Sequence, residues 1–79
     1  MLIQILGSGC SRCQDTAQRV TNVVARLGIA ADIRKVTDMK EIMAFGVLGT
    51  PAVVIDGKVR CYGRIPTEAE IEKWVTGQS

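Results

Sequence analysis

The sequence predicts an α/β domain whose elements follow the order β-α-β-α-β-β-α, with a four-stranded mixed sheet and helices on both faces. Three observations lead to this prediction. A short, apolar, β-branched run at 2–6 is followed by a helical repeat of apolar residues at 11–27. Two later β-rich runs flank Asp56-Gly57, which is a strong signal for a two-residue hairpin turn. The length of 79 residues fits a single domain spanning 1–79.

The first half of the chain is predicted to form a strand, a helix and a second strand. Residues 2–6 form a strand that ends at a glycine-rich turn. Residues 11–27 form a helix that ends at Gly28. The apolar positions of this helix share the spacing of three or four residues: Cys13, Ala17, Val20, Val24 and Leu27. Residues 29–36 form the second strand, in which Lys35 interrupts one face, and a crossover through a helix makes the two strands parallel.

A short second helix is predicted to begin at Asp38. Asp38 and Glu41 have the spacing of a capping box, with Asp in place of the usual Ser or Thr. The apolar face of this helix consists of three residues: Met39, Ile42 and Met43. Gly46 ends the helix, and a short loop then leads to Pro51.

The last part of the chain is predicted to form a hairpin and a third helix. The strands 52–55 and 58–62 flank the Asp-Gly turn. Pro51 has no N–H to donate to a sheet, so it lies at the start of its strand. The segment from Thr67 to Glu70 has the capping-box pattern and begins the last helix, which has three inward-facing residues: Ile71, Trp74 and Val75.

The composition argues against several classes of protein. Ten Lys and Arg against eight Asp and Glu give a net charge of +2, which is too small to indicate nucleic-acid binding. Histidine, the commonest general base and a common zinc ligand, is absent. No apolar run approaches the roughly 20 residues that span a bilayer, and the run at 1–6 is too short for a signal sequence. We therefore expect a cytoplasmic protein that binds neither nucleic acid nor a membrane.

The three cysteines allow a metal site or simple packing. A structural zinc site needs four ligands, whereas this chain offers Cys10, Cys13 and a distant Cys61. The ligand count argues against an intramolecular zinc site, while the pair Cys10 and Cys13 remains suitable for a soft metal or metalloid. Cys61 alternates with Val59 on one face of a predicted strand, and we interpret it as a core residue.

A redox pair explains Cys10 and Cys13 better than packing does. Cys13 lies on the inward stripe of its helix, whereas Cys10 lies in a glycine-flanked turn where exposure is expected. The backbone N–H groups and the macrodipole at a helix N-terminus favour a thiolate, and Arg12 adds positive potential. We therefore expect Cys10 to attack a target disulfide as the nucleophile, and Cys13 to act as the resolving thiol that breaks the mixed disulfide.

The Cys-x-x-Cys motif at a helix start and the later Thr50-Pro51 pair resemble the thioredoxin superfamily. The stretches GSGCSRC, GVLGTPAVVIDGKV and GRIPTEAEIEKW further resemble the small glutaredoxin-like thioredoxin-fold proteins called redox-active disulfide protein 2, over essentially the whole chain. The resemblance implies that Thr50 and Pro51 face Cys10 and Cys13, that the Thr50–Pro51 bond is cis, and that the Thr50 backbone binds an extended substrate. Gly63 is similar to a glycine that glutaredoxins use near glutathione.

We therefore expect a thiol–disulfide oxidoreductase that needs no cofactor and acts as a monomer. Its substrates would be disulfide-containing proteins or small thiols, and its electrons would come from a thioredoxin reductase-type protein or a low-molecular-weight thiol. Ser11-Arg12 differs from the pairs typical of thioredoxins and glutaredoxins, and Gln4 stands where thioredoxins carry a buried Asp. Two alternatives remain: a soft-metal or metalloid carrier that uses Cys10 and Cys13, and a thioredoxin-like domain that only docks onto a partner chain.

Overall fold

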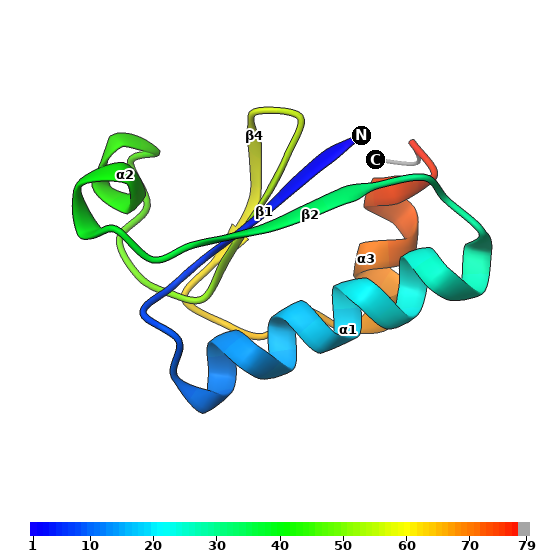
Figure 1. The fold of residues 1–79 in the computed structure, drawn as a ribbon, viewed down its shortest axis with the longest axis horizontal. Coiled ribbons are helices and arrows are strands. Elements are labelled where there is room, and N and C mark those ends of the chain that lie inside the picture. Colours follow the sequence, from blue (N-terminus) through cyan, green and yellow to red (C-terminus); the bar gives the residue numbers. More distant parts are fainter. Residues whose placement is uncertain (78–79) are drawn as a thin grey trace.

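The computed structural model describes residues 1–77 and has the predicted order of elements (Figure 1). The helices and strands follow one another along the chain as β1 (Leu2–Leu6), α1 (Ser11–Leu27), β2 (Asp32–Val36), α2 (Met39–Ala44), β3 (Ala52–Ile55), β4 (Lys58–Tyr62) and α3 (Glu68–Val75). The last two residues of the predicted domain 1–79 lie outside the described residues. Among residues 1–77, no helix has the length and apolar character needed to cross a bilayer.

The strands form one sheet in the order β2-β1-β3-β4. β1 pairs in parallel with β2 and antiparallel with β3, and β3 pairs antiparallel with β4, which confirms the predicted mixed sheet. β2 begins at Asp32 and not at Ile29 as predicted. The N–H of Ile29 donates to the carbonyl of Val24 at the end of α1, so this segment closes the helix before strand pairing starts.

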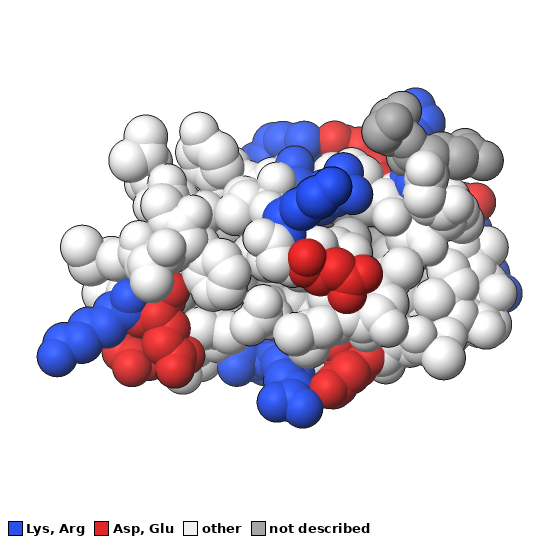
Figure 2. All heavy atoms as spheres, turned by 90° about the horizontal axis from the view of Figure 1, so that it is seen from above, with Lys and Arg blue, Asp and Glu red and all other residues white. Residues whose placement is uncertain are grey.

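Helices cover both faces of the sheet, as predicted (Figure 1). α1 and α3 contact each other on one face, and the larger core cluster lies between them and the sheet. Its members include Ile3, Val20 and Ile71, which have no solvent exposure. α2 lies on the other face, where Leu6 and Ile42 belong to a smaller cluster. On the face seen in Figure 2, Lys and Arg alternate with Asp and Glu and gather into no single basic stripe.

A β-bulge in β4 overturns the prediction that Val59 and Cys61 share one face. Val53 pairs with Cys61 and Val54 pairs with Val59, so Arg60 is an extra residue on the β4 strand. An extra residue reverses the alternation of side chains beyond it. Cys61 therefore packs into the larger cluster and Val59 against the smaller one. The interpretation of Cys61 as a buried core residue is confirmed.

α1 buries most of the predicted stripe but not its last member. Leu27 is 37% exposed, because it is the final residue of the helix and the chain turns at once at Gly28, which has φ 67°. Two residues outside the predicted stripe, Thr16 and Val23, are fully buried. The hydroxyl of Thr16 donates to the carbonyl of Arg12, which satisfies the buried polar group.

The predicted apolar face of α2 is largely wrong. Met39 is 60% exposed and Met43 is 67% exposed, and Ile42 is the buried residue of this helix. α2 has six residues, so it presents less than two turns to the sheet and buries one position. Asp38 caps the helix as predicted, and its carboxylate accepts from the N–H of Lys40.

α3 begins with the predicted capping box. The Thr67 hydroxyl accepts from the N–H of Glu70, and the Glu70 carboxylate accepts from the N–H of Thr67. Ile71 and Val75 are buried as predicted, and Trp74 is half-buried against the larger cluster.

Candidate active site

A strand, a turn and the first helical turn place two thiols side by side. Cys10 is the N-cap residue of α1 and is exposed, whereas Cys13 is 5% exposed. Both are free thiols, and their Sγ atoms are 3.1 Å apart in a hydrogen bond. The carbonyl of Cys10 accepts the first helical hydrogen bond, from the N–H of Gln14, at 3.0 Å. The helix start therefore fixes one thiol at the surface and the other beneath it.

The two thiols differ in their readiness to ionise. The thiol of Cys13, followed by the backbone N–H groups of Cys13 and Arg12, donates toward the Cys10 sulfur and holds the pKa of Cys10 below its ordinary value. Burial, followed by the hydrogen bond with Cys10, raises the pKa of Cys13. Cys10 is therefore the thiol that ionises first, as a nucleophile requires.

Gly7 is the residue on which Cys13 packs. A Cβ atom added to Gly7 would overlap the Sγ of Cys13 and would lie 3.1 Å from its Cβ. Gly7 is buried, and its N–H donates to the carbonyl of Val36 at 3.0 Å, so the backbone is held in place. The sequence indicated a glycine-rich turn here, and the structure adds that the missing side chain makes room for the buried thiol. Gly9 has φ 89°, which favours glycine.

The loop before β3 lies next to Gly7 and so comes close to Cys13. Thr50 lies beside Gly7, since a Cβ on Gly7 would be 3.8 Å from the Cβ of Thr50. The Thr50–Pro51 peptide bond is cis, and Pro51 is buried. The carbonyl of Pro51 accepts from the N–H of Gly63 at 2.9 Å, and Gly49 packs against the backbone of Gly63. This loop is thereby fixed between the thiols and the end of β4.

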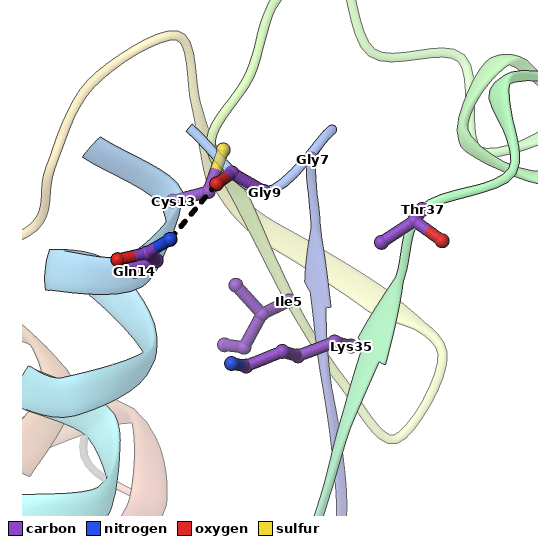
Figure 3. A pocket seen from close by; sticks show the side chains of 7 residues that line it. All are labelled: Ile5, Gly7, Gly9, Cys13, Gln14, Lys35 and Thr37. Atoms are coloured by element: carbon purple, nitrogen blue, oxygen red, sulfur yellow. Dashed lines mark hydrogen bonds between the residues drawn. The ribbon is translucent and has the colours of Figure 1, made fainter. Parts of the chain in front are cut away.

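A small pocket of about 70 Å³ lies beneath the thiols (Figure 3). Its lining comes from the ends of β1 and β2 and from the start of α1: Ile5, Gly7, Gly9, Cys13, Gln14, Lys35 and Thr37. The side-chain amide of Gln14 donates to the carbonyl of Gly9 at 3.0 Å. Figure 3 shows Lys35 extending from β2 toward Ile5 of β1.

Sequence reasoning did not find Gln14, Lys35 or Thr37 as residues near the thiols. The sequence analysis identified Lys35 only as the residue that interrupts an apolar strand face. A signal was present, because β1 and β2 are parallel and their carboxyl ends lie at the same edge of the sheet. Residues that follow the two strands therefore meet beside the first turn of α1.

The side chains of Arg12 and Cys61 take no part in the contact between the two sulfurs. Arg12 is exposed and acts on the pKa of Cys10 through its backbone N–H. Cys61 is buried in β4, and burial raises the pKa of its thiol. Within residues 1–77, no three His, Cys, Asp or Glu side chains come together in a group suited to a metal ion. A metal-binding hypothesis therefore retains two thiol ligands, Cys10 and Cys13.

Comparisons with known proteins identify the family of the chain. Residues 1–76 match the family model of the thioredoxin domain. Over 73 residues the chain is 36% identical to a thioredoxin of Methanothermobacter thermautotrophicus, which covers 92% of this chain and 95% of that relative. Over 73 residues it is also 41% identical to a thioredoxin of Methanocaldococcus jannaschii, covering 92% of this chain and 84% of that relative.

Proposed function

The chain belongs to the thioredoxin family of thiol–disulfide oxidoreductases, and we therefore propose that Cys10 and Cys13 are its redox-active pair. One observation supports this assignment above all others. An exposed thiol with a lowered pKa lies 3.1 Å from a buried thiol with a raised pKa, at the start of a helix. Such a pair has one thiol ready to attack and a second thiol within reach of the first.

The proposed exchange transfers two electrons and needs no cofactor. The Cys10 thiolate attacks one sulfur of a substrate disulfide, which forms a mixed disulfide and releases the first substrate thiolate. Cys13 then loses its proton and attacks the Sγ of Cys10, so the mixed disulfide breaks and the second substrate thiolate leaves. The two released thiolates take up protons. The substrate has been reduced, and Cys10 and Cys13 have been oxidised to a disulfide.

Thr50 and Pro51 form one side of the proposed substrate groove. This proposal is supported by the place of Thr50 beside Gly7, on which Cys13 packs. The Thr50 backbone would pair with an extended substrate chain, as an added strand does. The Arg12 guanidinium is proposed to add positive potential near Cys10, in addition to the effect of its backbone N–H.

We propose further that the chain is a small glutaredoxin-like member of its family and works in the cytoplasm as a monomer. The likeness of GSGCSRC and GVLGTPAVVIDGKV to such proteins supports the subtype. Three free cysteines suit a reducing compartment, where thiols are kept reduced. The oxidised pair would be reduced again by a thioredoxin reductase-type protein or by a low-molecular-weight thiol.

An equilibrium redox titration tests the proposed pair. The full chain is equilibrated with buffers of defined ratios of reduced to oxidised dithiothreitol, its free thiols are trapped by alkylation, and the modified residues are counted by mass. We expect one two-electron transition in which Cys10 and Cys13 become protected together. Cys61→Ser is the matched control, because Cys61 is a buried core residue, and it should leave the midpoint unchanged.

Two results would contradict the proposal. One is that Cys10 and Cys13 both remain reduced, and are therefore alkylated, in buffers that oxidise ordinary vicinal dithiols. The other is a midpoint that shifts in Cys61→Ser, which would mean that Cys61 takes part in the couple. Retention of a soft metal ion by a pair that resists oxidation would favour a carrier function that uses Cys10 and Cys13.

A further inference from the structure

Gln14 is hydrogen-bonded twice to the turn that carries Cys10. Its side-chain amide donates to the carbonyl of Gly9 at 3.0 Å, which is the dashed contact in Figure 3. Its backbone N–H donates to the next carbonyl, that of Cys10, also at 3.0 Å. Cys10 is the N-cap residue of α1, but its side chain makes no capping hydrogen bond. Gln14 therefore holds two consecutive carbonyls of the turn from within the helix.

The side-chain hydrogen bond fixes a residue that packing leaves free. Gly9 has φ 89°, and glycine adopts positive and negative φ about equally well. A Cβ atom added to Gly9 would meet no atom within 4 Å, so no neighbouring side chain holds this residue in place. The orientation of the Gly9 carbonyl therefore depends on the amide of Gln14.

The carbonyl of Gly9 and the N–H of Cys10 belong to one peptide group. This group is trans and planar, so its C=O and its N–H point in opposite directions. The carbonyl accepts from Gln14, while the N–H on the other side donates toward the sulfur of Cys13. A donor on the carbonyl also polarises the peptide group and strengthens its N–H as a donor. Gln14 thus acts on Cys13 through the peptide group between them.

The backbone N–H groups counteract the burial of Cys13. Burial, followed by the hydrogen bond with Cys10, raises the pKa of the Cys13 thiol, whereas the N–H groups of Gly9 and Cys10 lower it. In the mixed disulfide the sulfur of Cys10 is bonded to the substrate and carries no charge. Burial and the backbone N–H groups are then the causes that remain, at the step in which Cys13 has to ionise.

We propose that Gln14 is a positioning residue for the second step of the exchange: it holds the Gly9–Cys10 peptide so that the N–H faces Cys13 and supports its thiolate. This inference rests on the proposed function. In the second step Cys13 gives its proton to solvent, and its thiolate attacks the Sγ of Cys10. A disulfide forms between the two cysteines, the bond from Cys10 to the substrate sulfur breaks, and the substrate leaves as a thiolate.

One reaction separates the two steps of the exchange. The full chain is reduced with dithiothreitol, desalted and mixed with the symmetrical disulfide of 5-thio-2-nitrobenzoate in a stopped-flow instrument. Attack by Cys10 releases one nitrobenzoate thiolate at a rate proportional to the reagent concentration. Attack by Cys13 on the mixed disulfide releases the second at a rate that is independent of this concentration. Absorbance of the released thiolate gives a rate constant for each phase.

Gln14→Met keeps the length of the side chain and removes its donor. We expect it to slow the second phase about tenfold at pH 7, as weakening of one hydrogen bond to an ionised group would give, and to change the first phase by less than about twofold. The matched control is Gln18→Met, one turn further along α1, where the amide donates to Asn22 at 2.9 Å. Both glutamines are exposed, and the control should leave both phases unchanged.

The pH dependence separates an effect on the thiolate from an effect on the fold. The second phase follows the ionised fraction of Cys13, so the slowing in Gln14→Met should fade once the pH exceeds the pKa of this thiol in both chains. Besides Cys10, which is bonded to nitrobenzoate in this phase, the titratable side chain that lines the site with Cys13 is Lys35 of β2. β1 and the loop before β3 contain no titratable residue, and Lys35 is the same in both chains.

The outcomes distinguish this inference from the function on which it rests. If the second phase is missing in the wild-type chain, or depends on the reagent concentration, Cys13 does not resolve the mixed disulfide and the proposed function fails. If both phases occur and Gln14→Met leaves the second unchanged, the role of Gln14 is wrong and the function stands. The same holds if Gln18→Met slows the second phase equally, or if the slowing in Gln14→Met is constant at every pH.

Discussion

Two cysteines three positions apart experience opposite surroundings. Cys10 is exposed and receives hydrogen bonds from Cys13 and from backbone N–H groups, so its pKa is lowered. Cys13 is buried against Gly7, and its pKa is raised. The thiol of Cys13 supports the thiolate of Cys10 only while Cys13 keeps its proton. In the proposed mechanism, these opposite surroundings suit Cys10 to attack and Cys13 to resolution.

The hydrogen bond from Cys13 can be tested by removing its donor. Cys13→Ala should raise the pKa of Cys10, because the largest cause of the lowering is lost. Cys13→Ser is the matched control, since its hydroxyl still donates and should preserve part of the lowering. The rate of Cys10 alkylation by iodoacetamide, followed by mass across a range of pH, measures the thiolate in each variant. Equal profiles for the two variants would show that the backbone N–H groups act alone.

Gly7 should tolerate no side chain. Gly7→Ala places a Cβ over the Sγ of Cys13, and overpacking of this kind costs about 1–3 kcal/mol of the free energy of unfolding. Urea unfolding of the reduced protein gives this free energy. Ser8→Ala, at the exposed neighbouring position, should change it by less than about 0.5 kcal/mol. A Gly7→Ala variant as stable as Ser8→Ala would mean that Cys13 does not occupy the space beside Gly7.

The start of α3 concentrates polar contacts around one carboxylate. Glu70 closes the capping box with Thr67 and also accepts two hydrogen bonds from Arg64, at 2.8 and 2.6 Å. The hydrogen bond from Arg64, followed by that from the Thr67 backbone, lowers the pKa of Glu70 to about 2. This arrangement fixes the chain between Gly63, which binds the carbonyl of Pro51, and the third helix.

The carboxylate of Glu70 should make the stability of the chain depend on pH. Its folded-state pKa lies below the ordinary value of 4.5, so it adds stability above about pH 4.5 that is lost as the pH falls toward about 2. Because the Glu70 side chain is 34% exposed and solvent screens its charge, we expect Glu70→Gln to cost about 1 kcal/mol at pH 7 and nearly nothing at pH 2. Urea unfolding at both values, with Glu41→Gln on α2 as control, measures this difference. A constant cost across this range would show that Glu70 acts by its shape and not by its charge.

Local sequence signals predicted the bounds of several helices and strands correctly. The predicted bounds agree with the structure for 2–6, 11–27 and the hairpin, because periodic apolar runs and glycine turns are local signals. The bulge at Arg60 has no such signal, so the face of Val59 was predicted wrongly. Periodicity also cannot say whether an apolar face meets the sheet, and Met43 remains at the surface for that reason.

Only part of the candidate site could be predicted from the sequence. The spacing of Cys10 and Cys13 at a helix start is visible in the sequence, and so is the likeness that points to Thr50. The contact between Gly7 and Cys13 depends on how a helix sits over a strand end, which no local pattern specifies. The place of Lys35 near the thiols likewise follows from the parallel pairing of two strands that are far apart in sequence.

The whole molecule has two unequal cores separated by its sheet. The larger lies beneath α1 and α3 and includes Val20 and Ile71 from those helices. The smaller lies beneath α2, which contributes Ile42 as its buried residue. α1, whose first turn carries Cys13, packs on the larger core, whereas α2 packs on the smaller one. α2 therefore buries fewer side chains than α1, the helix that carries Cys13.

The unequal cores predict different responses to truncation. Ile71→Ala should lower the global free energy of unfolding by about 2–5 kcal/mol, measured in urea. Ile42→Ala should remove the hydrogen-exchange protection of α2 while the amides of β1 and α1 stay protected, because α2 loses its buried contact. Uniform loss of protection over all three elements in Ile42→Ala would show that both cores unfold as one unit.

The burial of Cys61 has a consequence for the handling of this protein in air. Three cysteines can pair in three ways. The fold leaves Cys10 and Cys13 with their sulfurs in contact and encloses Cys61 in the larger core on the bulged strand. Oxidation of the native chain should therefore yield a single intramolecular isomer. Mispaired isomers and disulfide-linked multimers through Cys61 should arise only from unfolded chains, so their amount in a stored sample reports how much of it has unfolded.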